Sequence, residues 1–284
     1  MTRHEHRGRA VESRSLAGRL GFVASVVLLV SPAVLLFLWM LSLSLKTEIA
    51  NIEYPPVFIP APPTLDNFVA VFAKNNFLLY FWNSLLVTGG AVAFGLLVGV
   101  PAGYGIARSK ATKSAVLILI ARMTPALSYL IPLFLMFQWL GLVGTRWALL
   151  ITHLVITVPI IVWVMIGYFE GVPAELEDAA LVDGASAWQS FTYVALPLAK
   201  PGVVVAAILA FIFSWNNFIF SVVLGSKNTR TLPSAVYNML TFEQISWGPL
   251  AAAALLVTLP VLVITVIAQR QIVAGLTAGA VKDG

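Results

Sequence analysis

Long apolar runs alternate with short polar or proline-rich segments along almost the whole chain of 284 residues. A helix needs about 20 apolar residues to cross a bilayer. Runs of about that length predict six membrane-spanning helices, at about residues 20–45, 81–106, 115–140, 147–168, 202–224 and 249–269. The predicted fold is therefore all-α and polytopic, with an N-terminal segment at 1–19, a membrane domain at 20–269 and a C-terminal tail at 270–284.

Composition supports a membrane protein and removes several other classes. The chain is 60% hydrophobic and 10% charged, whereas soluble domains carry roughly 25% charged residues. It has no cysteine, so disulfides and thiolate metal sites are excluded. The first apolar run is too long for a signal-peptide core, which predicts an uncleaved first span. The net charge of +5 is unaccompanied by a basic patch with interleaved aromatic residues, so no nucleic-acid partner is expected.

Lysine and arginine divide unequally between the two sides of a six-span chain, and positive residues gather on the cytoplasmic side. Eleven would lie with the termini and the 172–201 segment: Arg3, Arg7, Arg9, Arg14, Arg19, Arg108, Lys110, Lys113, Lys200, Arg270 and Lys282. Five would lie opposite: Lys46, Lys74, Arg146, Lys227 and Arg230. Both termini and the 172–201 segment are therefore expected to be cytoplasmic.

The 172–201 segment lies between two predicted spans and has the pattern of two short helices. Pro173 suits a first helical position, because its missing N–H would be unpaired there anyway. Glu177 follows in the early turns, where the helix dipole favours carboxylates. Gly184 can take the positive φ that ends a helix, and Ser186 with Gln189 fits a capping box for the second helix. These signals fit a functional loop or an amphipathic connector on the membrane surface.

Span two carries Gly95, Gly99 and Gly103, which share one helix face at four-residue spacing. Small residues at this spacing allow close helix contact in membranes. Span two is therefore predicted to be buried against another helix.

Two spans hold isolated ionisable residues. Arg122 in span three is either paired or functional, or close enough to the cytoplasmic end to extend to the membrane surface. Pro125 and Pro132 predict that this span is kinked. His153 in span four either faces a substrate cavity or is a packed, hydrogen-bonded residue. No second metal ligand lies at useful spacing, so no metal site is predicted.

Span five places Trp215, Asn216 and Asn217 near the middle of the membrane. An indole and two amides at that depth must find hydrogen-bond partners. One interpretation is that they join helices. The other is a sugar-type site, in which the aromatic face stacks on C–H surfaces and the amides bind hydroxyl groups.

The 172–201 segment also resembles the EAA loop of binding-protein-dependent ABC importer permeases, whose pattern is E-A-A-x3-G-x9-I-x-L-P. The matching positions are Asp178, Ala179, Ala180, Gly184, Val194, Leu196 and Pro197. Asp178 stands for the family's Glu, and Val194 for its Ile. Three further segments resemble the carbohydrate branch of that family: RMTPALSYLIPLFLMFQWLGLVGTRWALL, SWNNFIFSVVL and QRQIVAGLTAGAVK.

The resemblance implies a type I, maltose-permease-like fold in the bacterial cytoplasmic (inner) membrane. It implies three protein partners: a homodimeric ATPase that binds ATP-Mg, a second and different permease, and an extracytoplasmic substrate-binding protein. Substrate would be a sugar or sugar alcohol, moved by alternating access. The expected ATPase-coupling residues are Glu177, Asp178, Ala179, Ala180, Asp183, Gly184, Leu196 and Pro197. The expected substrate-pathway residues are Trp215, Asn216, Asn217, Arg122 and His153.

This chain is not expected to be an enzyme or to bind a cofactor. It has no G-x-x-x-x-G-K-[ST] phosphate-binding loop, and lone His153 is not a catalytic constellation. The competing class is an ion-coupled secondary transporter of a small neutral solute, or a channel. Such carriers usually use buried acidic or histidine relays, and no Asp or Glu lies in the middle of a predicted span.

Overall fold

The computed structural model describes residues 16–74, 76–240 and 245–280. Within them the regular elements are all helical, which confirms the all-α prediction. Their bounds are α1 Leu16–Ser44, α2 Glu48–Ile52, α3 Asp66–Lys74, α4 Phe77–Ser109, α5 Thr112–Met123, α6 Ala126–Trp139, α7 Arg146–Glu170, α8 Ala174–Val182, α9 Ala187–Ser190, the π-helical turn η1 Phe191–Ala195, α10 Leu196–Leu198, α11 Lys200–Trp215, α12 Ile219–Leu224, α13 Leu232–Tyr237 and α14 Trp247–Ala280.

Four of the described helices are long and apolar enough to cross a membrane unaided, namely α1, α4, α7 and α14. The number rises to six if each of two bent helix pairs is one crossing. These pairs are Thr112–Met123 with Leu127–Trp139, and Ala187–Leu198 with Lys200–Trp215. The helix α14 also continues to Ala280, so much of the predicted tail is helical. Residues 1–15 and 281–284 lie outside the described residues, and the boundaries of the two terminal segments stay predictions.

Two predicted spans are not single continuous helices. The 115–140 span is α5 and α6, which meet at 88°. Thr124 is extended at this break, because a residue before proline is disfavoured in the helical region, so the predicted kink is a full break at Pro125. The 202–224 span is α11 and α12, separated by residues 216–218.

The predicted glycine face of α4 packs against α7, which confirms its role in close helix contact. A Cβ on Gly95 or Gly99 would lie 2.8 Å from an Ile161 side-chain atom, and one on Gly103 would lie 2.7 Å from Met165 Cβ. At such distances a larger residue would require the α7 side chains to shift. The α4–α7 pair is therefore held by direct contact between one helix backbone and the side chains of the other.

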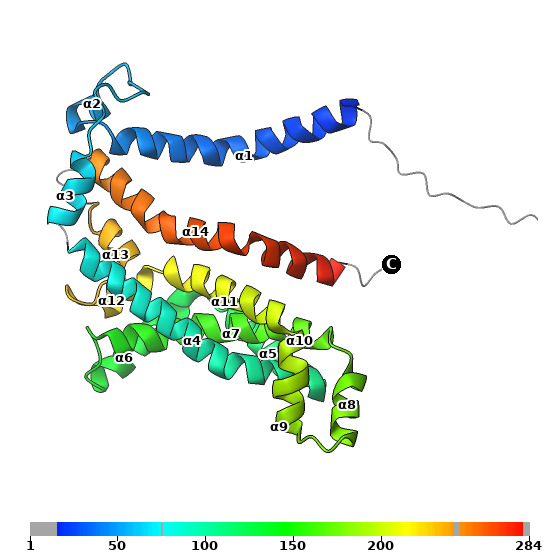
Figure 1. The fold of residues 1–284 in the computed structure, drawn as a ribbon. Coiled ribbons are helices and arrows are strands. Elements are labelled where there is room, and N and C mark those ends of the chain that lie inside the picture. Colours follow the sequence, from blue (N-terminus) through cyan, green and yellow to red (C-terminus); the bar gives the residue numbers. More distant parts are fainter. Residues whose placement is uncertain (1–15, 75, 241–244, 281–284) are drawn as a thin grey trace, which may run out of the picture.

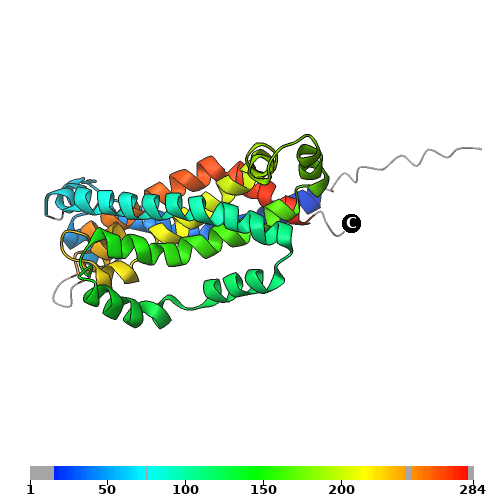
Figure 2. The same ribbon diagram turned by 90° about the horizontal axis from the view of Figure 1, so that it is seen from below.

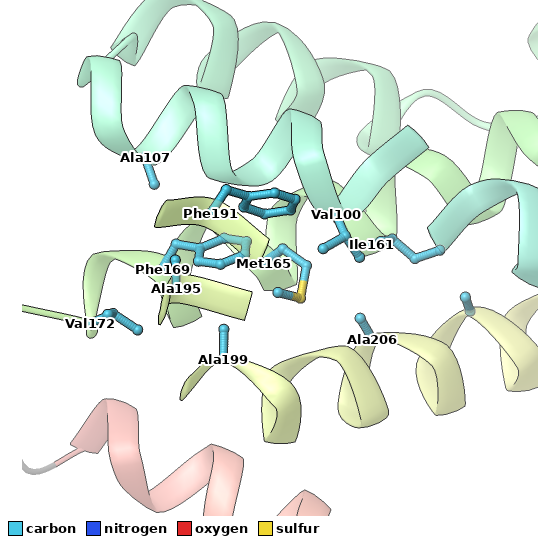
Figure 3. Packing of buried hydrophobic residues seen from close by; sticks show 11 residues of the cluster. Val100, Ala107, Ile161, Met165, Phe169, Val172, Phe191, Ala195, Ala199 and Ala206 are labelled. Carbon is cyan, nitrogen blue, oxygen red and sulfur yellow. The ribbon is translucent and has the colours of Figure 1, made fainter. Parts of the chain in front are cut away.

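A single buried cluster joins this helix pair to α11 and to the 172–201 segment. Figure 3 shows Phe169 and Phe191 between the end of α4 and the start of α11, with Met165 beside them. The helix α11 approaches α7 so closely at Gly202 that a Cβ there would lie 2.3 Å from the Tyr168 ring. The helices α4, α7 and α11 thus form one packed core.

The remaining long helices lie outside that core. The helix α1 runs beside α14 (Figure 1), and between Ser25 and Ser44 most of its residues are exposed. Figure 2 shows α5 and α6 along one edge of the bundle. The start of α1 and the end of α14 lie at the same end of the bundle as α8 and α9 (Figure 1), as an even number of crossings requires.

At the opposite end of the bundle, the loop between α12 and α13 is tied to α4 and α7 through Asn83. The Asn83 Nδ2 group donates to the carbonyl oxygens of Asn228 at 2.9 Å and Arg230 at 3.0 Å. Its Oδ1 atom accepts from Arg146 Nε at 2.7 Å. Asn83 is fully buried, so these bonds also satisfy a polar side chain that would otherwise be costly to bury.

The N-terminus of α14 is fixed at the same end. The Glu48 carboxylate accepts from the backbone N–H groups of Trp247 at 2.8 Å and Gly248 at 3.1 Å, where a negative charge also suits the helix dipole. Nearby Lys46 is almost completely buried, and desolvation lowers the pKa of its ammonium group. The α1–α2 connection and α14 are therefore joined by specific polar contacts.

We predict that Gly103→Val will destabilise the chain by about 1–3 kcal/mol, because the added methyl groups must displace Met165. Thermal unfolding of the detergent-purified protein measures this loss. Gly105→Val is the matched control on the same helix, since nothing lies within 4 Å of a Cβ at Gly105. Equal melting temperatures for the two variants would contradict the proposed close contact.

Candidate functional site

The 172–201 segment folds as two helical pieces, as its sequence predicts. The helix α8 begins at Ala174, so Pro173 is the residue before the helix and not its first residue. Gly184 has φ +90°, which confirms its predicted role in ending α8. The Ser186–Gln189 capping box is present in both directions, with Ser186 N donating to Gln189 Oε1 at 2.7 Å and Gln189 N donating to Ser186 Oγ at 3.3 Å.

Neighbouring acidic residues of α8 face opposite ways. Asp178 is exposed, together with Ala179 and Asp183. Glu177 is buried, and its carboxylate is bound by Arg108 and Tyr104 of α4. Glu177 is one of the expected ATPase-coupling residues, and that role stays a prediction; its carboxylate is bound within the chain.

The exposed side of this segment combines carboxylates with large apolar side chains. Val182 is 87% exposed and Trp188 is 66% exposed, although both are apolar. They flank the turn at Gly184, beside Asp178 and Asp183. Exposed apolar residues grouped near charges are typical of a surface that binds another protein.

The second helical piece leads directly into α11. It passes through the π-helical turn η1 and then through α10, which contains the predicted Leu196 and Pro197. The axis turns by 74° before α11. Buried Ala195 and Ala199 lie on either side of this turn, and their small side chains let it pack on the core. A displacement of α9 is thus transmitted covalently to α11.

Trp215 is part of the helix packing where the end of α11 meets the start of α4 and α14. It is 2% exposed, and its indole N–H donates to the Val257 carbonyl of α14 at 3.0 Å. Its ring stacks on Phe211, with centroids 5.3 Å apart. These contacts join α11 to α14, and the place of Trp215 in the substrate pathway stays a prediction.

The two asparagines that follow have a different environment. Asn216 is exposed and Asn217 is half-buried. Asn216 Nδ2 donates to the Ile212 carbonyl at 2.9 Å, and Asn217 Oδ1 accepts from the Phe220 N–H at 3.4 Å. These local bonds compete with helix continuation, which accounts for the break between α11 and α12. The break leaves amide groups on the surface of this chain.

His153 lies buried beside this break. Its Nδ1 atom is 2.7 Å from Ser214 Oγ, and Ser214 Oγ donates to Thr88 Oγ1 at 3.3 Å. This chain of polar groups joins α7, α11 and α4. His153 is 1% exposed, and its Nε2 atom is buried without a hydrogen-bond partner; its place in the substrate pathway stays a prediction.

Arg122 is not brought to the other candidate residues. It is exposed in the last turn of α5. The one salt bridge among the described residues joins Arg108 and Glu177, and Arg122 takes no part in it. The described residues also contain no group of three metal-ligand side chains.

Sequence reasoning missed the roles of Arg108 and Tyr104. Both lie near the end of span two, about 70 positions before Glu177, and no local pattern could pair them with that residue. The available signal was Arg108 itself, as the first charged residue after a long apolar run.

Comparison with known proteins identifies the family. The family described as "Binding-protein-dependent transport system inner membrane component" matches residues 91–277, which is more than half of the chain. This protein therefore belongs to that family and is a permease subunit of ABC importers.

Particular relatives extend the likeness over nearly the whole chain. The trehalose transport system permease protein SugB of Mycobacterium tuberculosis is 36% identical over 261 residues, covering 90% of this chain and 94% of that protein. The sulfoquinovosyl glycerol transport system permease protein SmoH of Agrobacterium fabrum is 33% identical over 270 residues, covering 93% of each chain. The likeness does not favour an ion-coupled secondary transporter.

A solved structure supports the fold. A chain of a bacterial ABC transporter that imports the acidic polysaccharide alginate matches with a TM-score of 0.71 at 23% identity, covering 90% of this chain and 98% of that chain. The family match and these relatives confirm the predicted resemblance to ABC importer permeases, and the solved structure supports the predicted fold.

We predict that Gly184→Val will disorder the turn between α8 and α9, because a β-branched residue in the left-handed region costs about 1–2 kcal/mol. Hydrogen exchange at residues 183–185 should become faster. Gly184→Asn is the matched control, since Asn tolerates this region and no atom lies within 4 Å of a Cβ at this position. If the two variants exchange alike, the positive φ is not what holds the turn.

Proposed function

We propose that this chain is the permease subunit of an ATP-driven importer that moves a sugar or a sugar alcohol across the inner membrane by alternating access. The observation that carries the proposal is the exposed EAA-type surface of α8 and the following turn on a chain of this family. The named relatives that transport trehalose and sulfoquinovosyl glycerol support the carbohydrate class.

The energy would come from a homodimeric ATPase partner that binds ATP-Mg. Asp178, Ala179, Ala180, Asp183 and Gly184 would form the contact with that partner, with Leu196 and Pro197 carrying movement into α11. Support comes from their position: they belong to one helical segment that is exposed on one side and joined to the core on the other.

A second, different permease would complete the translocation path. Asn216 and Asn217 would contribute amide groups to it at the α11–α12 break, where a neutral hydroxylated substrate can replace water as hydrogen-bond partner. The exposed residues of α1 and the edge formed by α5 and α6 leave room for such a partner. An extracytoplasmic binding protein would deliver substrate to the opposite end, with both termini in the cytoplasm.

We predict that Asp178→Arg will lower substrate-stimulated ATP hydrolysis by at least about tenfold, because reversing a charge in a protein contact costs several kcal/mol. The measurement is ATPase activity of the complete transporter in lipid bilayers, with binding protein and a panel of sugars and polyols. Glu170→Arg, an equal charge change on an exposed residue outside the EAA pattern, serves as the control.

Stimulation of the parent by one ligand of the panel, lost in Asp178→Arg and kept in Glu170→Arg, would support the proposal and identify the substrate. Normal stimulation and transport by Asp178→Arg would contradict the coupling role of this surface. A parent that responds to no sugar or polyol would contradict the substrate class.

We predict that Asn216→Ala will weaken sugar binding to the transporter about fivefold, which corresponds to the loss of about 1 kcal/mol for one hydrogen bond. Equilibrium binding of labelled sugar to the purified complex measures this. Trp215→Phe should instead leave binding unchanged and lower thermal stability, because it removes only the buried bond to Val257. Weaker sugar binding by Trp215→Phe, with unchanged binding by Asn216→Ala, would place Trp215, and not Asn216, in the pathway.

A further inference from the structure

The 172–201 segment is called the coupling segment from here on. It touches α4 through a group of side chains that the proposed function does not use. This group is the Arg108–Glu177–Tyr104 cluster. We propose that these are positioning residues, which make α8 move together with α4 so that span two receives the displacement of the loop directly. The inference rests on the proposed function, because it assumes that α8 is displaced by an ATPase partner.

Arg108 joins two parts of the segment at once. Its Nε atom donates to Glu177 Oε1 at 2.8 Å, and Nη2 also contacts that oxygen. The same Nη2 donates to the Val172 carbonyl at 3.1 Å, in the linker between α7 and α8. The planar guanidinium can hold this set of acceptors in a fixed geometry, which a lysine ammonium cannot.

Tyr104 binds the other side of the same carboxylate and also packs on the core. Its hydroxyl donates to Glu177 Oε2 at 2.5 Å. Its ring lies 5.3 Å from that of Phe169 in α7 and 4.7 Å from that of Phe191 in η1. One residue of α4 therefore contacts the helix before the loop and both helical pieces within it.

These side chains are the connection between α8 and α4. The backbone of α8 lies close to α9 and η1, whereas its link to α4 spans the length of the Arg108 and Tyr104 side chains. Glu177 is 5% exposed, and removing one partner of a buried ion pair leaves an uncompensated charge. The cluster therefore resists separation of α8 from α4.

The Arg108–Glu177–Tyr104 cluster determines which helices move together. The loop continues covalently into α7 and α11, and α4 is packed on α7 through its glycines. The cluster adds a second attachment at the end of α4 nearest the loop. With both in place, α4 and α8 keep a constant distance when the loop is displaced, and Glu177 acts inside the chain, while Asp178 faces the ATPase.

The absence of native cysteine makes this distance measurable. Spin labels at Ser109→Cys on α4 and Glu175→Cys on α8, both exposed, report the separation in the complete transporter, without nucleotide and with ATP. The test variants are Arg108→Gln, Glu177→Gln, their double variant and the exchange Arg108→Glu with Glu177→Arg. Asp178→Asn is the control on the adjacent, outward-facing acid. Transport per ATP hydrolysed is measured alongside.

We expect one narrow distance in the parent, unchanged by ATP, and a wider, nucleotide-dependent distribution in both single variants. Transport per ATP should fall severalfold in each, no further in the double variant, and recover in part in the exchange. Asp178→Asn should keep the parent distance and instead weaken association with the ATPase.

Three outcomes would overturn the inference. The distances of the variants could match the parent in both states. The distances could widen with transport per ATP unchanged, which would make the cluster purely structural. Glu177→Gln could lose ATPase association while Arg108→Gln keeps it, which would make Glu177 a direct contact. The distance measurement needs no sugar, so a parent that fails to respond to the ligand panel rejects the proposed substrate and still leaves the cluster tested.

Discussion

The direct contact between the α4 backbone and α7 is the constraint on which the rest of the structure depends. Lipid offers no hydrophobic driving force between helices, so close packing has to supply it. Three glycines allow α4 to approach Ile161 and Met165 at distances that a Cβ would forbid. The helix α11 then packs on this pair. The helices α4, α7 and α11 therefore form one packed central unit. The 172–201 segment lies at its edge and can transmit force to it.

The coupling segment uses this unit in two ways. Its outer side presents exposed acids and apolar residues, whereas its inner side is bound to the core by Phe191 and Glu177. The segment is thereby stiff toward the membrane domain and open toward a partner. A force applied to such an element is transmitted instead of being absorbed by local bending, as rigid-body transitions between packed arrangements require.

The sequence predicted those features that depend on neighbouring residues. Apolar runs indicated the long helices, and Gly184 with the Ser186–Gln189 pair indicated the turn and cap, because each depends on local backbone chemistry. The EAA pattern gave the family. It could not give the orientation of Glu177 relative to Asp178, since both are acidic and adjacent and only contact with distant Arg108 separates them. It also treated Trp215 and Asn216 alike, although α14 covers only the first.

The α11–α12 break has an energetic consequence of its own. Three residues within the predicted fifth span leave the regular helix, and an unpaired backbone group in hydrocarbon costs several kcal/mol. The side chains of Asn216 and Asn217 offset part of this cost through local hydrogen bonds. The remaining polar groups require water or another chain. Water that reaches these groups inside a membrane domain would provide a route for protons and ions. Whatever covers this break in the resting transporter must therefore also preserve the membrane potential.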